Sequence, residues 1–323
     1  MSKAFPYLEV KGTNIDLGHT VGEKFRDRIN WWVDRLHADP HYQDKLSCYP
    51  QYLTPTQEHF PNLVEEVRAI ASAAHVDFAD MFILNTVELE QIYPERCTSV
   101  VSFGNPTVIG HNEDALDYMK DDLYVLKATI GDTAFLGLNY AGEIPGTSVA
   151  MNNWGVVQCV NTLHQKTSQI GVPRYFLARA ILECHSLEEA EDVVTKTSKA
   201  SGLNHFLVQG ENVKNIEIAG NQHRVTDKTN VCFFHTNHYL DPSLVQFESD
   251  RSKSSVIRYQ KALDKLTDGM SESEILALLS SADQKHILDS GFVTHCSILL
   301  FPQKGEMKIY DSSLNAVATH TLR

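Results

Sequence analysis

The first third of the chain has a helical pattern of apolar positions. Between residues 16 and 37 apolar side chains recur every three or four positions, which is the spacing of one face of an α-helix. A strand over 7–12 precedes this segment, and further helices are predicted over 54–71 and 77–92, with Asp77 as a cap of the last one. The repeating apolar residues of the first helix are Val21, Phe25, Ile29, Val33 and Leu36.

The pattern changes from helical to extended at Cys97. Residues 97–103 and 107–112 flank a Gly-Asn-Pro turn and predict a β-hairpin. The segments after it predict strands, then two helices, more strands, a helical stretch and two final strands. The predicted strands are 122–131, 133–142, 147–153, 156–163, 205–210, 215–220, 224–229, 230–237, 295–302 and 306–311, and the helical segments are 172–184, 186–199 and 252–279. This order favours an α+β fold of two sheets with helices outside them.

Length and composition fit one large domain with a sizeable core. The chain has 323 residues, of which 42% are hydrophobic. Its 28 basic and 41 acidic residues give a net charge of −13, which argues against nucleic acid or an anionic membrane as a partner. No apolar run approaches the ~18 residues of a membrane span, and the first residues lack an apolar signal core. We therefore expect a cytoplasmic protein.

The cysteines and histidines do not predict a metal site. The six cysteines are scattered and form no CxxC pair, a pattern typical of reduced thiols. His235 and His238 are three residues apart in a predicted strand, so their side chains would point to opposite faces. The sequence also lacks a G-x-S-x-G elbow, a phosphate-binding loop and a dinucleotide fingerprint. We expect neither a metal nor an organic cofactor.

Several short motifs follow one another along the chain. They are Cys97-Thr98-Ser99, Gly110 to Leu116, Tyr140 to Gly146, Asn152 to Gly155, Asn161-Thr162-Leu163, Gly171 to Arg174 and His235 to His238. Together they resemble the motifs of the C45 peptidase family, which includes the acyl-CoA:isopenicillin-N acyltransferases. More distant similarity extends to acid ceramidases and bile-salt hydrolases. The substrate-side segments look most like the insect branch that hydrolyses β-alanyl-dopamine and carcinine. The resemblance spans most of the chain.

This resemblance implies a four-layer αββα N-terminal-nucleophile (Ntn) fold that cuts itself between Arg96 and Cys97. In such enzymes one residue supplies the nucleophile through its side chain and the base through its free α-amine. An α-amine has a pKa of about 7.7–8.0 and a thiol one of about 8.5, so both are poised near neutral pH. Residues 1–96 would then form a helical light subunit that stays bound to the catalytic segment 97–323.

The resemblance also assigns roles to individual residues. Cys97 would be the nucleophile, and Asp114 would hold the new α-ammonium. Asn237 would donate its amide to the oxyanion. Asn152 would be a second donor there or a turn residue.

The chain departs from its relatives at three places. Arg96 replaces a glycine before the nucleophile, and a bulky residue there would slow cutting. His111 stands where the bile-salt branch has arginine, and would either replace that cation or only pack. An arginine of the fungal enzyme has no counterpart around residues 287–289.

The sequence leaves the reaction and the substrate open. Hydrolysis and acyl transfer use the same acyl-enzyme and differ only in the acceptor, water or an amine. The insect-like segments favour hydrolysis of a small N-acyl amide, with β-alanyl as one acyl group, and a transferase would use acyl-CoA. Glu113 and Glu143 are candidate partners for a β-alanyl ammonium. A catalytically silent binding module is the non-enzymatic alternative. Whether the chain forms a homodimer is also open.

Overall fold

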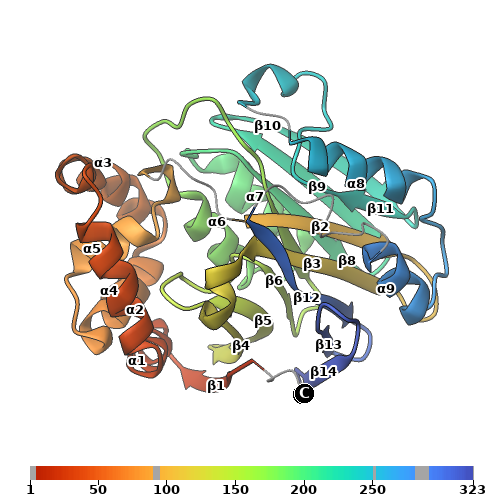
Figure 1. The fold of residues 1–323 in the computed structure, drawn as a ribbon, viewed down its shortest axis with the longest axis horizontal. Coiled ribbons are helices and arrows are strands. Elements are labelled where there is room, and N and C mark those ends of the chain that lie inside the picture. Colours follow the sequence, from red (N-terminus) through yellow and green to blue (C-terminus); the bar gives the residue numbers. More distant parts are fainter. Residues whose placement is uncertain (1–4, 90–94, 250–251, 281–290, 323) are drawn as a thin grey trace.

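Two largely antiparallel sheets lie face to face, with helices on their outer sides (Figure 1). The computed structural model describes residues 5–89, 95–249, 252–280 and 291–322. One sheet has the order β1 (Tyr7–Gly12), β4 (Leu123–Ile130), β5 (Thr133–Tyr140), β6 (Val149–Asn152), β7 (Val157–Thr162), β8 (Leu203–Gln209), β9 (Asn212–Ala219) and β10 (Gln222–Thr229). The other has the order β11 (Phe233–His235), β2 (Glu95–Ser102), β3 (Val108–Leu116), β12 (Phe292–Phe301), β13 (Glu306–Tyr310) and β14 (Ala316–Thr321).

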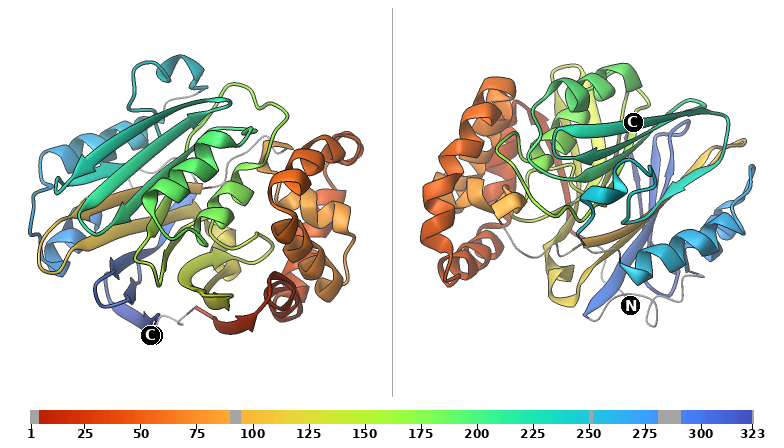
Figure 2. Two further views of the ribbon diagram at one scale, coloured as in Figure 1. Left: turned by 180° about the vertical axis from the view of Figure 1, so that it is seen from behind. Right: turned by 90° about the horizontal axis from the view of Figure 1, so that it is seen from above.

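Helices form three groups around these sheets (Figures 1 and 2). The N-terminal group contains α1 (Asn14–Lys24), α2 (Arg26–His37), α3 (Tyr42–His59), α4 (Pro61–Ala74), α5 (Phe78–Leu84) and the 3₁₀ turn η1 (Val87–Leu89). The second group is α6 (Arg174–Ile181) with α7 (Leu187–Lys196), and the third is α8 (Lys253–Leu263) with α9 (Glu272–Ser280). Short 3₁₀ turns η2 (Asp117–Asp122) and η3 (Val245–Phe247) complete the described helices.

The core between the sheets follows from the alternation of side chains along each strand. On β2 and β3, Val101, Ile109 and Ala115 are fully buried and face the apolar side chains of the eight-stranded sheet. The intervening residues Val100 and Val108 pack instead against α8 and α9. Each strand of this hairpin therefore contacts the second sheet on one face and a helical layer on the other.

Apolar clusters on the outer faces complete the four layers. The N-terminal helices pack on the eight-stranded sheet through residues such as Leu17 and Val67, which meet Tyr124 and Phe135. Helices α6 and α7 cover the same face further along. The arrangement is the predicted αββα sandwich.

The structure refines several predicted helices. The helix predicted over 16–37 is two helices that meet at Phe25, whose φ of −112° and ψ of 21° lie outside the helical region. The second predicted helix, over 54–71, is also two helices, the end of α3 and most of α4, which meet at Phe60. The part of α3 from Tyr42, with its two internal prolines, was not predicted. The third ends at Leu84 and is followed by η1, and its last predicted residues lie outside the described ranges. Ser186 caps α7 by accepting a hydrogen bond from Glu189 N, as predicted.

Candidate active site

The pairing of β2 with β3 brings Cys97 to a buried polar cluster. Cys97 pairs with Glu113, and Ser99 pairs with His111, so these four side chains share the face of the hairpin directed at the other sheet. The ligand-type atoms of Cys97, His111 and Glu113 all lie within 4.8 Å of one another. All three side chains are buried. The apolar space between the sheets thus becomes polar at the end where the predicted nucleophile lies.

His111 and Glu113 form a buried ion pair within this cluster. His111 Nε2 lies 3.2 Å from Glu113 Oε2, and Nδ1 lies 3.0 Å from Ser99 Oγ. Burial alone would lower the pKa of His111, but its contacts with the thiols of Cys159 and Cys97 and with Glu113 outweigh that effect and raise the pKa well above its usual value. This shift favours the imidazolium form of His111 beside Cys97.

Glu113 is fully engaged by neighbouring donors. Tyr140 Oη donates to Glu113 Oε1 at 2.8 Å, and Ser148 Oγ donates to Oε2, which also faces His111. Both carboxylate oxygens are thus occupied, and the charge is balanced by the imidazolium. This arrangement argues against the predicted role of Glu113 as a partner for a substrate ammonium.

The backbone of Cys97 is held by two side chains from distant segments. Cys97 N donates to Asn237 Oδ1 at 2.9 Å. Arg258, on α8, donates to Cys97 O at 2.6 Å and to Asn237 Oδ1 at 2.7 Å. The guanidinium also donates to Thr98 Oγ1 at 2.7 Å, and Arg258 is only 2% exposed. The nucleophile at the predicted cutting point is therefore fixed at both its backbone nitrogen and its backbone oxygen.

Asn237 presents its amide oxygen, not its amide nitrogen, to Cys97. Its Nδ2 donates to Thr162 O at 3.1 Å. The donor that the oxyanion role requires is thus engaged elsewhere in this state of the chain. The geometry fits a side chain that accepts from the nitrogen of Cys97.

Asp114 lies on the opposite face of β3 from the Cys97 side chain. It pairs with Arg96 across the hairpin, and its Oδ1 accepts a hydrogen bond from Thr294 Oγ1. Its Oδ2 is buried without a hydrogen-bond partner among the described residues. Burial raises the pKa of Asp114 to about 6, although Arg258 and Thr294 oppose the shift. A buried carboxylate with an unused oxygen beside the Arg96–Cys97 peptide suits a group that receives a new α-ammonium.

Two asparagines of the eight-stranded sheet have different surroundings. Both ends of the Asn152 amide are hydrogen-bonded to backbone. Its Oδ1 accepts from Trp154 N and Val156 N in the turn after β6, and its Nδ2 donates to the carbonyls of Leu182 and Cys184 after α6. Asn161, on β7, instead faces the cluster. Its Oδ1 accepts from Ser99 Oγ at 3.1 Å, and its Nδ2 is buried with no partner in the described parts of the chain.

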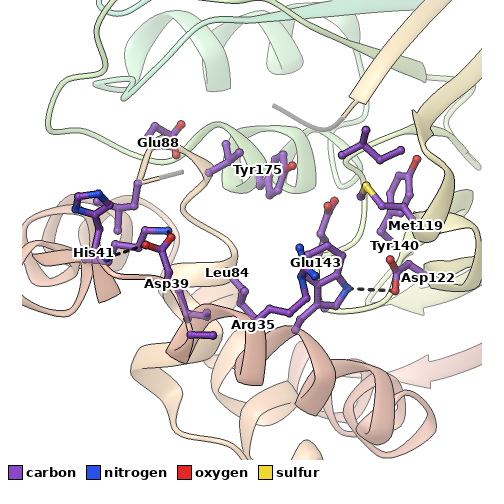
Figure 3. A pocket seen from close by; sticks show the side chains of 18 of the residues that line it. Arg35, Asp39, His41, Leu84, Glu88, Met119, Asp122, Tyr140, Glu143 and Tyr175 are labelled. Carbon is purple, nitrogen blue, oxygen red and sulfur yellow. Dashed lines mark hydrogen bonds and ion pairs between the residues drawn. The ribbon is translucent and has the colours of Figure 1, made fainter. Parts of the chain in front are cut away.

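A cavity of about 980 Å³ adjoins this cluster (Figure 3). Its walls come from α2, α3, η1, η2, the loop after β5, and the start of α6. Tyr140 is shared, since it lines the cavity and donates to Glu113. Glu143, the second predicted ammonium partner, also lines the cavity and is partly exposed. The cavity therefore lies one side chain away from the polar cluster around Cys97.

Comparison with known proteins assigns the family. Residues 102–310 match the acyl-coenzyme A:6-aminopenicillanic acid acyl-transferase family, which is more than half of the chain. The chain belongs to this family. The family assignment predicted from the motifs is thereby confirmed, and with it the class of Ntn amide hydrolases and acyltransferases.

Individual proteins that are similar to this chain agree with the family assignment. The chain is 27% identical over 218 residues to the beta-alanyl-dopamine/carcinine hydrolase of Drosophila melanogaster, a match that covers 58% of this chain and 56% of the relative. It thus spans little more than half of that protein's length. Two crystal structures of conjugated bile acid hydrolase from Clostridium perfringens, each of a mutated form of that enzyme, have a TM-score of 0.50. They are 11% and 12% identical, and each match covers 70% of this chain and 92% of theirs. At such identity they show the shared Ntn fold alone.

Three residues of the site in this family member were not predicted to act there. Asn161 lies in one of the matching motifs, but whether its side chain faces the cluster depends on the strand register. Ser99 belongs to the Cys-Thr-Ser motif, which assigned it no role of its own. Arg258 lies in a helical stretch without a local motif, and only the fold brings it to Cys97. The expected position of a missing arginine, around residues 287–289, lies outside the described residues.

The two histidines of the His235–His238 segment have separate partners. His235 Nε2 lies 3.0 Å from Glu217 Oε1, whereas His238 Nδ1 lies 2.8 Å from Ser255 Oγ. They have different partners, and His238 lies beyond the end of β11. In the described residues, Cys97, His111 and Glu113 are the group with metal-ligand atoms close together, and both ring nitrogens of His111 are engaged by Ser99 and Glu113. No helix in the described ranges is long and apolar enough to cross a membrane.

Proposed function

We propose that the chain is a self-processing cysteine amidohydrolase that cleaves a small N-acyl amide through a thioester on Cys97. The main observation behind this proposal is the set of contacts that surrounds Cys97. Its nitrogen is held by Asn237 and its oxygen by Arg258, while its thiol lies with His111 and Glu113. An ordinary core cysteine needs none of these contacts.

Maturation would begin at the Arg96–Cys97 peptide, which lies within β2. The thiol attacks the Arg96 carbonyl, the peptide shifts from nitrogen to sulfur, and water cleaves the resulting thioester. Cys97 N then becomes an α-amine that already faces Asn237 Oδ1. The unused oxygen of Asp114 would stabilise the ammonium form of that amine.

Turnover would reuse the same atoms. The α-amine accepts the thiol proton as Cys97 attacks the substrate carbonyl. The free Nδ2 of Asn161 is the donor best placed to stabilise the oxyanion, and the His111 imidazolium adds positive charge beside it. The amine leaves with the proton, and water then hydrolyses the acyl-enzyme.

A small acyl group with an ammonium, such as β-alanyl, is the substrate that the Drosophila relative suggests. Such a group needs a carboxylate in the substrate cavity. Because Glu113 is occupied, Glu143 is the remaining predicted candidate. Acyl transfer from acyl-CoA or an amide to an amine is the second candidate, favoured by the family match. The two differ only in whether water or an amine reaches the acyl-enzyme.

The first experiment is intact-mass analysis and N-terminal sequencing of the purified protein beside its Cys97→Ala variant. Scaling the mass by segment length, wild type should give fragments of roughly 11 and 25 kDa, the larger starting Cys-Thr-Ser-Val, and the variant should stay whole. The cut protein should then release the amine from β-alanyl amides. An intact wild-type chain with an inert thiol would instead favour a silent binding module.

The two reactions are separated by adding a second amine to the assay. Hydrolysis predicts free acid as the product whatever the amine concentration. Transfer predicts that a new amide accumulates in proportion to the added amine. The proposed hydrolase would be wrong if new amide formed to the exclusion of free acid.

A further inference from the structure

The cavity that Tyr140 shares with the cluster around Cys97 contains a carboxylate with one oxygen that has no partner among the described residues. Two of the five acidic side chains on the cavity wall are paired with an arginine or a lysine of the chain. Asp122 accepts from Arg28 and from Trp32 Nε1 at 3.1 Å, and Asp39 accepts from Lys45 Nζ at 2.9 Å. Figure 3 shows Asp39 and Asp122 near opposite edges of the cavity. The acidic residues in the cavity wall are Asp39, Asp44, Glu88, Asp122 and Glu143.

Glu88 is buried and fixed like Asp122, but one of its carboxylate oxygens has no described partner. It lies on η1 and is only 7% exposed. Its Oε1 accepts from Arg174 N at 3.0 Å and from Ser201 Oγ at 2.6 Å. Its Oε2 is buried and has no hydrogen-bond partner in the described part of the chain. Burying an ionised oxygen without a partner costs free energy, which a cationic ligand would recover.

We propose that Glu88 forms the ammonium subsite of the substrate cavity and selects amides whose acyl group carries a primary ammonium. This inference rests on the proposed amidohydrolase function, and it assigns the selectivity to a residue of the N-terminal segment. Because only one carboxylate oxygen is available, Glu88 offers a single charged contact. A compact ammonium matches that contact, whereas a guanidinium would seek two parallel acceptors.

The surroundings of Glu88 fit an aminoalkyl chain. Val87 and Leu89 flank it in sequence, and both line the cavity together with Tyr175. Figure 3 shows Glu88 and Tyr175 along the same side of the cavity, while Asp122 and Tyr140 lie at the other end. Methylene groups could thus pack on apolar wall while the ammonium reaches Glu88. At the end with Tyr140, the hydroxyl of that residue donates to Glu113, which pairs with Cys97 across the hairpin.

The two residues that the sequence predicted as ammonium partners, Glu113 and Glu143, fit this role less well. Glu113 accepts from Tyr140 and Ser148 and faces His111. Glu143 also lines the cavity, but as a whole residue it is more exposed than Glu88, which two donors hold in place. Glu88 combines a dry setting with an open oxygen.

The test is equilibrium binding to the uncut Cys97→Ala protein, by calorimetry at neutral pH. The probes are N-benzyl-β-alaninamide, which has an ammonium, and N-benzylbutanamide, which has a methyl group in its place. The Cys97→Ala protein should bind the ammonium probe at least about tenfold more tightly than the neutral one. Adding Glu88→Gln should abolish that preference while leaving the neutral probe unaffected. Adding Glu143→Gln instead should change it less than about threefold.

Either of two results would overturn the assignment. One is an unchanged preference in Glu88→Gln, and the other is a preference lost in Glu143→Gln alone. Should the glutamine variant fail to fold, Glu88→Asp keeps the charge but withdraws it by one methylene, and it should also lose the preference. The amidase proposal fails separately, because mature wild-type protein that hydrolyses neither probe would not alter the binding result.

Discussion

The side-chain oxygen of Asn237 accepts hydrogen bonds from both the backbone nitrogen of Cys97, at 2.9 Å, and the guanidinium of Arg258, at 2.7 Å. The nitrogen is the atom that self-cleavage would turn into the α-amine. Arg258 helps to hold the Asn237 amide oxygen toward the Cys97 nitrogen. The Asn237 amide nitrogen points elsewhere and donates to Thr162 O at 3.1 Å. Asn237 is thus arranged as an acceptor for the catalytic base and not as a donor to an oxyanion.

This relationship predicts different outcomes for two substitutions of Asn237. Asn237→Asp keeps an acceptor beside Cys97 N and should retain kcat within about tenfold of wild type. Asn237→Ala removes the acceptor and leaves Arg258 with one partner fewer, so kcat should fall by about 10². Steady-state kinetics on the mature proteins would measure both. Equal losses in the two variants would restore the oxyanion-donor role for the amide nitrogen.

Asn161 should carry the donor role instead. Its amide nitrogen is buried and has no hydrogen-bond partner among the described residues. Removing this nitrogen should lower kcat by about 10²–10³ with little change in KM. Asn161→Ala is the variant, and Asn152→Ala is its matched control. Asn152 bonds two N–H groups of its own turn and two carbonyls that follow α6, so its loss should lower the melting temperature and spare kcat in the folded protein. The reverse pattern would transfer the oxyanion site to Asn152.

Arg96 should limit the rate of self-cleavage. Its guanidinium lies 4.4 Å from the centre of the Phe292 ring, a contact that holds the residue before the scissile bond in its strand. Arg96→Gly removes this contact and allows the backbone to distort toward the tetrahedral intermediate. The cleavage half-time, followed by intact mass, should shorten several-fold, while Arg96→Lys should leave it nearly unchanged. A slower glycine variant would show that the arginine assists the cut.

The fold was predictable from sequence to the extent that patterning controls it. The change from helical to alternating spacing at Cys97 marked the start of β2, and the hairpin with β3 followed from its turn. The break at Phe25 was not predictable, because apolar spacing continues through it and tertiary packing separates α1 from α2. The early start of α3 was also missed, because two prolines mask its helical character.

The site was predictable only where one local segment contains it. The hairpin positions of Cys97, His111 and Glu113 follow from a short turn and a two-residue period. Arg258 is 161 positions from Cys97 along the chain, and its contact depends on how α8 packs on the sheet. Glu88 looked like any helical acidic residue until the fold buried it against Arg174 and Ser201.

Asp114 should make the stability of the uncut chain depend on pH. Its pKa is raised by burial to about 6, above the value of about 3.9 for an unfolded aspartate. Between these values the folded state binds more protons than the unfolded one, so stability is present below about pH 4 and is lost as pH rises through 6. Adding Asp114→Asn to the Cys97→Ala protein should therefore raise the free energy of unfolding at pH 7 by up to about 3 kcal/mol. The melting temperature should rise with it.

The pH profile separates this effect from a general change in packing. The gain from Asp114→Asn should shrink as the pH falls from 7 to 4, because the wild-type carboxyl becomes neutral too. The same substitution at exposed Asp34 is the control and should give no gain at any pH. A gain that is constant with pH would mean that the carboxylate is not responsible. In active protein the same substitution should abolish turnover, since the α-ammonium loses its counterion.

Residues 1–96 should stay bound after the cut, because a buried ion pair joins them to the catalytic segment. Glu66 on α4 accepts two hydrogen bonds from Arg179 on α6, at 3.0 and 2.8 Å, and both side chains are fully buried. Glu66→Ala leaves Arg179 buried without that partner, which should cost about 3–5 kcal/mol. The cut variant should therefore release its smaller fragment at a lower urea concentration than wild type in size-exclusion chromatography. Glu65→Ala, which removes an exposed ion pair with Arg68 one position away, should leave the fragments together. If both variants released the fragment at the same urea concentration as wild type, the attachment would have to come from the apolar contacts of α1 and α4 alone.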